Sequence, residues 1–491
     1  MDNTSNKSSL TSKTISGFVW LSIGKAFKAI SHLVVLYFLV RLLETADFGL
    51  LGMAMIVISF ADIFSDIGVG PALIQREKLS NVDISTGLWF SIVFGVLITT
   101  VIWFLSPFIA DFFKEDNLTV VLRWISLVLF IKSIAIVAQS LLYRDLKYKL
   151  ITISELISYV FGYGLVGILL AYNDFGVWSL VAAVIAQALL ATLMLNFFAK
   201  PRYRVDFSRT SLKLLLLYGG GYSLSKIFSF LGSRGDNIIV GRYLGASLLG
   251  IYERSYHLNK FFASLVGDIM DKVLFSPFSR KQNDKKLLAS IFLELTELVA
   301  IVLIPFSLFI SLNANHIVLF LLGEDWIEAI APTRIIGIAI FFMISSRIGN
   351  ILSKSLGGVY NRAAINFIYG FTVVVGSYFA SAWGLKGVSL VVVLALLFNY
   401  LLSFVQIKKL TKVNALLFAK AHLLGLLIAL AVFLVNHLMS NLTTSLQSGL
   451  IPLVINTFVS CIVFGAFVWL LPNPVIKKYH KTILSFIKIK K

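Results

Sequence analysis

Charged residues are scarce in this chain of 491 residues, and their scarcity excludes an ordinary soluble fold. Asp, Glu, Lys and Arg make up 14% of the residues, whereas soluble domains average about 25%. A soluble protein of this length divides into several domains, each of which needs a polar surface. The chain has too few charged side chains to cover such surfaces, so its composition indicates that lipid covers much of it.

Cysteine and catalytic motifs are also nearly absent. The single cysteine, Cys461, permits no internal disulfide and no cysteine-based metal site. The sequence contains no pair of histidines at metal spacing and no G-x-x-x-x-G-K-[ST] loop for ATP. We therefore expect a protein that holds no metal or cofactor and that is not an enzyme.

Hydrophobic residues, by contrast, make up 58% of the chain and recur in runs of about 20 residues. Runs of this length cross the roughly 30 Å hydrocarbon core of a bilayer as helices. The sequence therefore predicts an all-α integral membrane protein with about fourteen transmembrane helices. We expect these helices at about 16–40, 50–69, 86–109, 119–141, 152–171, 177–198, 213–240, 247–270, 288–311, 328–351, 362–381, 386–405, 415–437 and 450–471.

Lys and Arg residues, which give the chain a formal net charge of +19, gather in alternate loops. The loops assigned to the cytoplasm contain groups of basic residues, among them Arg144, Lys147, Lys354 and Arg362. The opposite loops hold acidic residues, such as Asp111, Glu115 and Asp174. Because Lys and Arg are enriched in cytoplasmic loops, this pattern predicts an even number of spans and two cytoplasmic termini. The basic residues form no single patch, which excludes nucleic acid as a partner.

The chain also resembles itself after a shift of 201 residues. Ser22 then aligns with Ser223, Lys25 with Lys226, Arg41 with Arg242 and Gly49 with Gly250. Six helices separate the two copies, so both run in the same direction, and parallel repeats place a substrate site at their interface. We expect a six-helix lobe at 1–200, a second at 201–410, and two further helices with a basic cytoplasmic tail at 411–491.

Several cations fall inside the predicted helices. Lys25, Lys28 and His32 share one face of the first helix, because they stand at i, i+3 and i+7. The other candidates are Lys226, Arg234, Arg254 and Arg347. Charges at membrane depth face a cavity, pair with one another or reach toward the water, and the sequence leaves these alternatives open. A cavity richer in cations than in anions predicts an anionic, phosphate-bearing substrate.

Acidic residues within the helices form two close pairs. Asp62 and Asp66 are four residues apart, and Glu294 and Glu297 are three apart. Two carboxylates that share a site favour the binding of a proton or a cation, so these residues are candidates for ion coupling. The alternative is that they neutralise the buried lysines, and the spacing does not distinguish the two roles.

Three segments carry a family resemblance: "LVRLLETADFGLLGMAM", "DIGVGPALIQREKLS" and "DNIIVGRYLGASLLGIYERSYHL". They resemble the polysaccharide-transporter family, the Wzx-like flippases, and in particular its colanic-acid and teichuronic-acid exporter branch. The wider superfamily also contains multidrug extruders and lipid II flippases. The resemblance covers most of residues 15–410 and implies movement of undecaprenyl-diphosphate-linked oligosaccharide repeat units across the bacterial inner membrane, for lipopolysaccharide or exopolysaccharide synthesis.

The same resemblance implies a mechanism and partners. It implies alternating access by two lobes around a cationic cavity, to which Lys25, Lys28, Arg254 and Arg347 contribute. It also implies a groove for the lipid tail beside the helices within 415–471. Membrane lipid, the lipid-linked oligosaccharide, a polysaccharide polymerase and chain-length machinery are the expected partners.

Three other interpretations remain. A multidrug-type or a lipid II-type exporter belongs to the same superfamily, although the drug extruders have twelve helices and fewer buried cations. A membrane polysaccharide polymerase needs sizeable outer loops to build its site, and the outer loops here are short.

Overall fold

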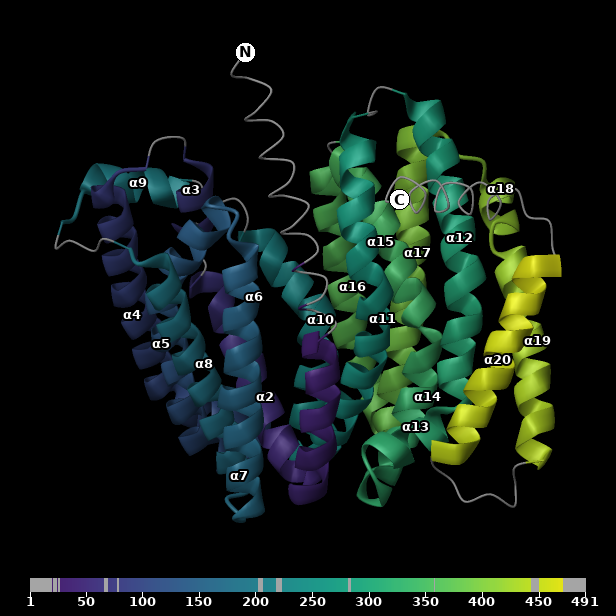
Figure 1. The fold of residues 1–491 in the computed structure, drawn as a ribbon, viewed down its shortest axis with the longest axis horizontal. Helices are drawn as coiled ribbons and strands as arrows, with labels where there is room; N and C mark the ends of the chain where they lie inside the picture. Colours follow the sequence, from purple (N-terminus) through teal and green to yellow (C-terminus); the bar gives the residue numbers. More distant parts are fainter. Residues whose placement is uncertain are drawn as a thin grey trace, which may run out of the picture. The chain divides into compact units, whose positions relative to one another are not determined.

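The fold is entirely helical in the part of the chain that the structure describes (Figure 1). The computed structural model describes residues 20, 24, 27–65, 69–76, 79–201, 206–217, 223–280, 284–356, 358–442 and 450–470. All regular elements within these residues are α-, 3₁₀- or π-helices, which confirms the all-α prediction.

Ten segments of the described chain are long and apolar enough to cross a membrane. One of them, Asn361–Thr411, contains two long helices joined by a short turn. Two more helices, α10 (Ser223–Leu244) and α11 (Ala246–Arg280), are long enough but are not among the ten. Both carry several charged residues, which lower their hydropathy, so the prediction of fourteen helices stays a prediction.

The first compact unit consists of Met1–Phe230 and Asn237–Ile251. Its helices pack through small residues, since a Cβ at Gly95 of α4 would lie 2.6 Å from the Ser133 hydroxyl of α5. Small residues let membrane helices approach closely in this way. Besides the helix over 27–42, its elements are α2 (Thr45–Ser65), α3 (Val69–Gln75), α4 (Asn81–Phe113), α5 (Leu118–Arg144), α6 (Tyr148–Ile157), η1 (Ser158–Leu165), α7 (Val166–Tyr172), α8 (Val177–Ala199) and α9 (Arg209–Leu217).

The second compact unit consists of Leu231–Asp236 and Tyr252–Lys491. Its core forms where one face of α12, including Leu288, Phe292 and Leu295, packs with Ile344 and Ile348 of α15. The predicted division at 200 and 410 stays a prediction. The elements are parts of α10 and α11, then α12 (Lys285–Leu312), α13 (Ala314–Leu321), η3 (Glu324–Ala329), α14 (Ile330–Ile338), α15 (Ile340–Ser355), α16 (Val359–Ala380), η4 (Ser381–Trp383), α17 (Gly384–Thr411), α18 (Ala415–Lys420), α19 (Leu423–Leu442) and α20 (Leu450–Leu470).

Some helices extend beyond their apolar runs. The third predicted helix, 86–109, is the longer α4, which begins at Asn81. Ser80 caps it, because its hydroxyl accepts from the Asp83 N–H while the Asp83 carboxylate accepts from the Ser80 N–H. Such a capping box stabilises a polar first turn that hydropathy does not reveal.

The two copies of the repeat meet each other within the first unit. A Cβ added at Gly49 would overlap the carbonyl oxygen of Ala246, and a Cβ added at Gly250 would overlap that of Thr45. The hydroxyls of Thr45 and Ser247 lie 2.6 Å apart. After the shift of 201 residues, Thr45 aligns with Ala246 and Gly49 aligns with Gly250. The contact is therefore reciprocal, because the glycine of each copy lies against the backbone carbonyl of the other copy. This crossing of α2 and α11 explains why both copies of the repeat carry glycine.

We expect Gly49→Ala and Gly250→Ala each to destabilise the protein. The added methyl group has no room beside the opposing carbonyl, and overpacking of this kind costs about 1–3 kcal/mol. The measurement is the midpoint of thermal unfolding of the purified protein in detergent. Gly465→Ala is the matched control, because a Cβ at Gly465 meets no atom within 4 Å in the structure. Equal midpoints for the three variants would contradict the close crossing.

Candidate functional site

Two members of the predicted cationic stripe pair with the segment Tyr148–Tyr172, the fourth of the ten that are apolar enough to cross a membrane. The Lys28 ammonium donates to Glu155 Oε2 at 3.2 Å, and His32 Nδ1 lies 2.8 Å from the Tyr159 hydroxyl. Both pairs are separated by 127 residues, so the helix over 27–42 and the α6–η1 helix run parallel in constant register. The third member, Lys25, lies outside the described residues.

Tyr159 belongs to a π-helical segment, η1, in which each turn is wider than in an α-helix. Gly162 lets this wide turn approach α8, because a Cβ there would lie 2.6 Å from Gln187 Cα. The Tyr163 ring stacks on the Tyr159 ring at a centroid distance of 5.5 Å. The π-helix therefore holds Tyr159 beside His32 and Tyr163 against Tyr159, and π-helical turns occur frequently at functional sites.

The acidic candidates differ in their surroundings. Asp62 accepts from the Lys132 ammonium at 3.2 Å, so it has a cationic partner on α5. Its predicted companion Asp66 lies outside the described residues. Glu294 and Glu297 are half-buried on α12 and both take part in side-chain interactions. A role in ion coupling stays a prediction for all four.

In the second unit, residues of α10 and α11 bring several charged side chains together. Arg234 Nη1 of α10 donates to Glu253 Oε1 of α11 at 3.1 Å. Arg254 Nη2 lies 3.8 Å from the other oxygen of the same carboxylate. Beside this pair of contacts, the buried Tyr252 hydroxyl donates to Asp236 Oδ2 at 2.7 Å. Two predicted site residues, Arg234 and Arg254, therefore share one buried carboxylate.

Two further cations complete this group. Lys260 of α11 lies close enough to interact electrostatically with Arg234, Asp236, Glu253 and Arg347, the last on α15. We call Arg234, Asp236, Glu253, Arg254, Lys260 and Arg347 the charge cluster. Four cations and two carboxylates leave it with a formal net charge of +2. The sequence pointed to three of the cations, but Lys260 and the bridging Glu253 depend on how α10, α11 and α15 pack.

Another predicted cation cannot be placed in this group. Lys226 belongs to α10, but its side chain lies outside the described part of the structure. The predicted role of Lys226 in substrate binding, and its equivalence to Lys25 in the repeat, therefore stay predictions.

One basic residue assigned to the cytoplasmic side lies in the first turn of α16 and is buried. Arg362 is only 6% exposed on α16. Its guanidinium donates to Ser403 Oγ at 2.8 Å and to Asn399 Oδ1 at 3.2 Å, both on α17. The cytoplasmic position of Arg362 stays a prediction. Its burial was not visible in the sequence, because the polar residues that accept these hydrogen bonds come from a different helix.

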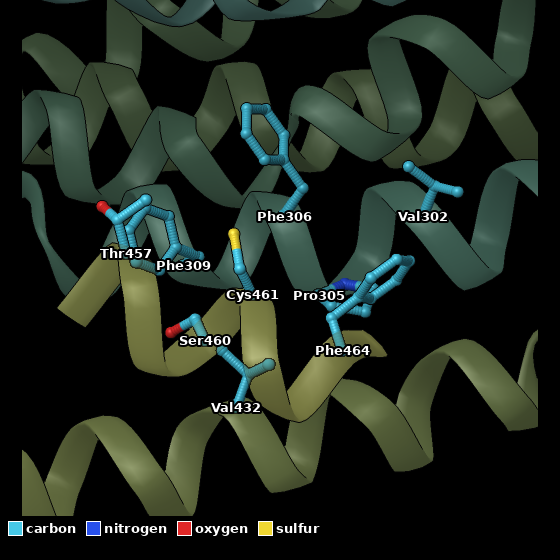
Figure 2. A pocket seen from close by; sticks show the side chains of 9 residues that line it. All are labelled: Val302, Pro305, Phe306, Phe309, Val432, Thr457, Ser460, Cys461 and Phe464. Atoms are coloured by element: carbon cyan, nitrogen blue, oxygen red, sulfur yellow. The ribbon is translucent and has the colours of Figure 1, made fainter. Parts of the chain in front are cut away.

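An apolar groove of about 210 Å³ lies between α12, α19 and α20 (Figure 2). The Cys461 thiol points from α20 toward α12, which contributes Phe306 to the lining. Pro305 also lies on this wall, within an α12 helix that continues through it. The lining residues are Val302, Pro305, Phe306, Phe309, Val432, Thr457, Ser460, Cys461 and Phe464.

A network of buried amides joins the three helices beside this groove. Asn313, at the end of α12, donates to Asn436 Oδ1 of α19 at 3.0 Å and accepts from Asn456 Nδ2 of α20 at 2.8 Å. Asn436 also donates to the Ser460 hydroxyl at 3.0 Å. Interhelical hydrogen bonds of this kind fix the packing of membrane helices, so the network holds the groove walls in place.

Part of the chain matches a known protein family. Residues 38–331, more than half of the chain, match the family model described as "Polysaccharide biosynthesis protein". The chain belongs to this polysaccharide biosynthesis protein family. The match spans the helices of the first unit and includes Arg234, Glu253, Arg254 and Lys260 of the charge cluster.

Curated members with similar sequences come from distant bacteria. The chain is 25% identical over 407 residues to the lipopolysaccharide biosynthesis protein WzxC of Escherichia coli, covering 82% of each chain. It is 26% identical over 388 residues to the teichuronic acid biosynthesis protein TuaB of Bacillus subtilis, covering 76% of this chain and 80% of TuaB.

The fold is shared with solved membrane transporters. The lipid II flippase MurJ, in an inward closed conformation, matches with a TM-score of 0.73 at 12% identity, over 92% of this chain and 98% of MurJ. An inward-facing multidrug resistance MATE transporter matches with a TM-score of 0.59 at 14% identity, over 81% of this chain and all of that one. At these identities the matches establish the transporter fold, not the substrate.

Proposed function

We propose that this protein is a flippase that moves undecaprenyl-diphosphate-linked oligosaccharide repeat units across the bacterial inner membrane for surface polysaccharide synthesis. The observation that carries the proposal is the charge cluster of the second unit, whose six residues lie together and carry a formal net charge of +2. Membership of the polysaccharide biosynthesis family and the similarity to WzxC and TuaB support the same substrate class.

A diphosphate fits this cluster for a physical reason. Isolated charge at membrane depth costs about 2.5–3.5 kcal/mol or more per side chain, so an excess of cations is retained only where it has a use. The planar guanidinium groups of Arg234 and Arg254 match phosphate oxygens with two parallel hydrogen bonds, and Lys260 adds a point charge. A ligand with two negative charges would neutralise the cluster.

The apolar groove between α12, α19 and α20 suits the lipid part of the same substrate. Its walls are aromatic and aliphatic, and it contains only the hydroxyls of Thr457 and Ser460 as polar groups. A polyprenyl chain needs such an apolar surface, whereas the sugars need water or polar side chains. We therefore assign the charge cluster to the diphosphate and the groove to the tail.

Transport by alternating access would complete the function. Two compact units and a transporter fold are consistent with lobes that open in turn to each side of the membrane. The basic loops support cytoplasmic termini, and we propose no catalytic role for the protein. A polymerase and chain-length machinery would use the delivered units. Coupling to an ion at Asp62, Asp66, Glu294 or Glu297 is part of this proposal.

We expect the double variant Arg234→Gln, Arg254→Gln to abolish export while the protein stays in the membrane. Truncating a charged group that binds a buried anion costs roughly 2–5 kcal/mol, so transport should fall more than tenfold. The measurement is restoration of surface polysaccharide in a strain that lacks the gene, together with the lipid-linked sugar that accumulates in the cytoplasmic leaflet.

Lys386→Gln serves as the matched control for that experiment. Lys386 is an exposed cation at the start of α17, in the same unit as the charge cluster but not part of it. It should restore polysaccharide fully. Full restoration by the double arginine variant as well would overturn the assignment of the cluster to the diphosphate.

The groove can be tested with the chain's only cysteine. Cys461 is exposed and lines the groove, so N-ethylmaleimide should label it in the purified protein. Undecaprenyl phosphate should slow this labelling several-fold, because a bound tail would cover the thiol. The rate of modification by mass spectrometry is the measurement.

A neighbouring position supplies the control. In the variant Cys461→Ser, Ile462→Cys, the new thiol replaces a side chain that is 54% exposed and does not line the groove. Its labelling should be insensitive to the lipid. Equal protection at both positions would indicate that the lipid coats the protein nonspecifically, and it would contradict the assignment of the groove to the lipid tail.

A further inference from the structure

The carboxylate of Glu253 is the meeting point of two arginines from different helices. Its side chain is 4% exposed, and the side chains of Arg234 and Arg254 are 25% and 10% exposed. Both of its oxygens are engaged, one by each guanidinium. The other acid in the cluster, Asp236, accepts from the Tyr252 hydroxyl instead. Glu253 is thus the carboxylate that the two arginines have in common.

The two contacts are unequal in strength. Arg234 Nη1 lies 3.1 Å from Glu253 Oε1, a normal distance for an N–H···O hydrogen bond. Arg254 Nη2 lies 3.8 Å from Glu253 Oε2, which is an ion pair beyond hydrogen-bond distance. Glu253 therefore holds Arg234 firmly and Arg254 loosely, although one carboxylate attracts both.

A carboxylate and a phosphate oxygen use the same guanidinium N–H groups. A diphosphate that binds Arg234 and Arg254 must consequently share these donors with Glu253 or displace it. The competition also has an electrostatic part, since a fixed negative charge beside the site opposes a second anion. In a buried site that opposition is stronger than it would be in water.

We propose that Glu253 is an internal competitor of the substrate, which lowers the affinity of Arg234 and Arg254 for the diphosphate and so permits its release. This inference rests on the proposed function, because it names a specificity-setting residue of the same site. A transport site must bind its cargo strongly enough to admit it and weakly enough to let it go. Two arginines without a carboxylate between them would retain a diphosphate too long.

The alternative is that Glu253 only positions the arginines. The two roles predict opposite signs for one measurement, the affinity for a diphosphate ligand. If Glu253 competes, removing its charge tightens binding. If it only positions, removing its charge frees the arginines to move and weakens binding.

The experiment measures binding of farnesyl diphosphate to the purified full-length protein in lipid nanodiscs. Glu253→Gln keeps the shape of the side chain and removes its charge, and we expect about tenfold tighter binding, within the roughly 5–150-fold range of typical coupling between ligands. Release of the probe should slow by a similar factor. Weaker or unchanged binding by Glu253→Gln would overturn the proposal.

Two further variants secure the interpretation. Glu253→Asp keeps the charge but moves it back by one methylene, so binding should tighten by a smaller factor, about threefold. Weaker binding by this variant would also contradict competition. The Asp variant therefore tests the proposal even if the Gln variant fails to fold. Glu328→Gln removes an exposed carboxylate of η3 in the same unit and should leave binding unchanged.

Failure of the proposed function would look different. In that case the wild-type protein would bind farnesyl diphosphate no better than farnesol, which shares the tail and lacks the phosphates. Tight binding by the wild type with no gain in Glu253→Gln would instead leave the flippase proposal standing and reject the role of Glu253 alone.

Discussion

A buried charge needs a counter-charge nearby, and this constraint governs the charge cluster of the second unit. Arg234, Arg254, Lys260 and Arg347 face only Asp236 and Glu253 as fixed counter-ions within the charge cluster. The low dielectric of the interior makes a charge without a counter-charge expensive, and the formal net charge of +2 on the cluster supports the proposed anionic substrate. The first unit contrasts with it, since Lys28 and Lys132 there each have a carboxylate partner.

Close helix packing is found in both units. The helices α10 and α11, which carry most of the cluster, also supply residues to the first unit, where Gly250 of α11 crosses Gly49 of α2. Amides of Asn313, Asn436 and Asn456 fix the last two helices against α12. Small residues and buried amides thus replace the hydrophobic effect, which does not drive helices together in lipid.

Much of this could be predicted from the sequence, because hydropathy and spacing are local properties. The apolar runs predicted the helical fold, and the repeat alignment paired Gly49 with Gly250, which lie against each other in the structure. The family resemblance was confirmed by the match over residues 38–331. The cationic residues of the helices were also visible, although not which of them would lie together.

The remaining features depend on contacts between distant parts of the chain. The hydrogen bond of Arg234 to Glu253 joins two helices, and burial of Arg362 depends on Asn399 and Ser403 of a neighbouring helix. The π-helical turns of η1 likewise follow from packing against α8. No local pattern encodes such features, so the spacing of charges indicated an anionic substrate without showing how the site holds it.

The most direct test of this account is a comparison of two lipids in proteoliposomes that contain the purified protein. One lipid carries a disaccharide on undecaprenyl diphosphate, and the other carries the same disaccharide on a polyprenol without phosphate. Movement between leaflets is followed by the access of a lectin to the sugar. The account predicts rapid movement of the diphosphate-linked lipid only, whereas equal rates for both lipids would contradict recognition through buried positive charge.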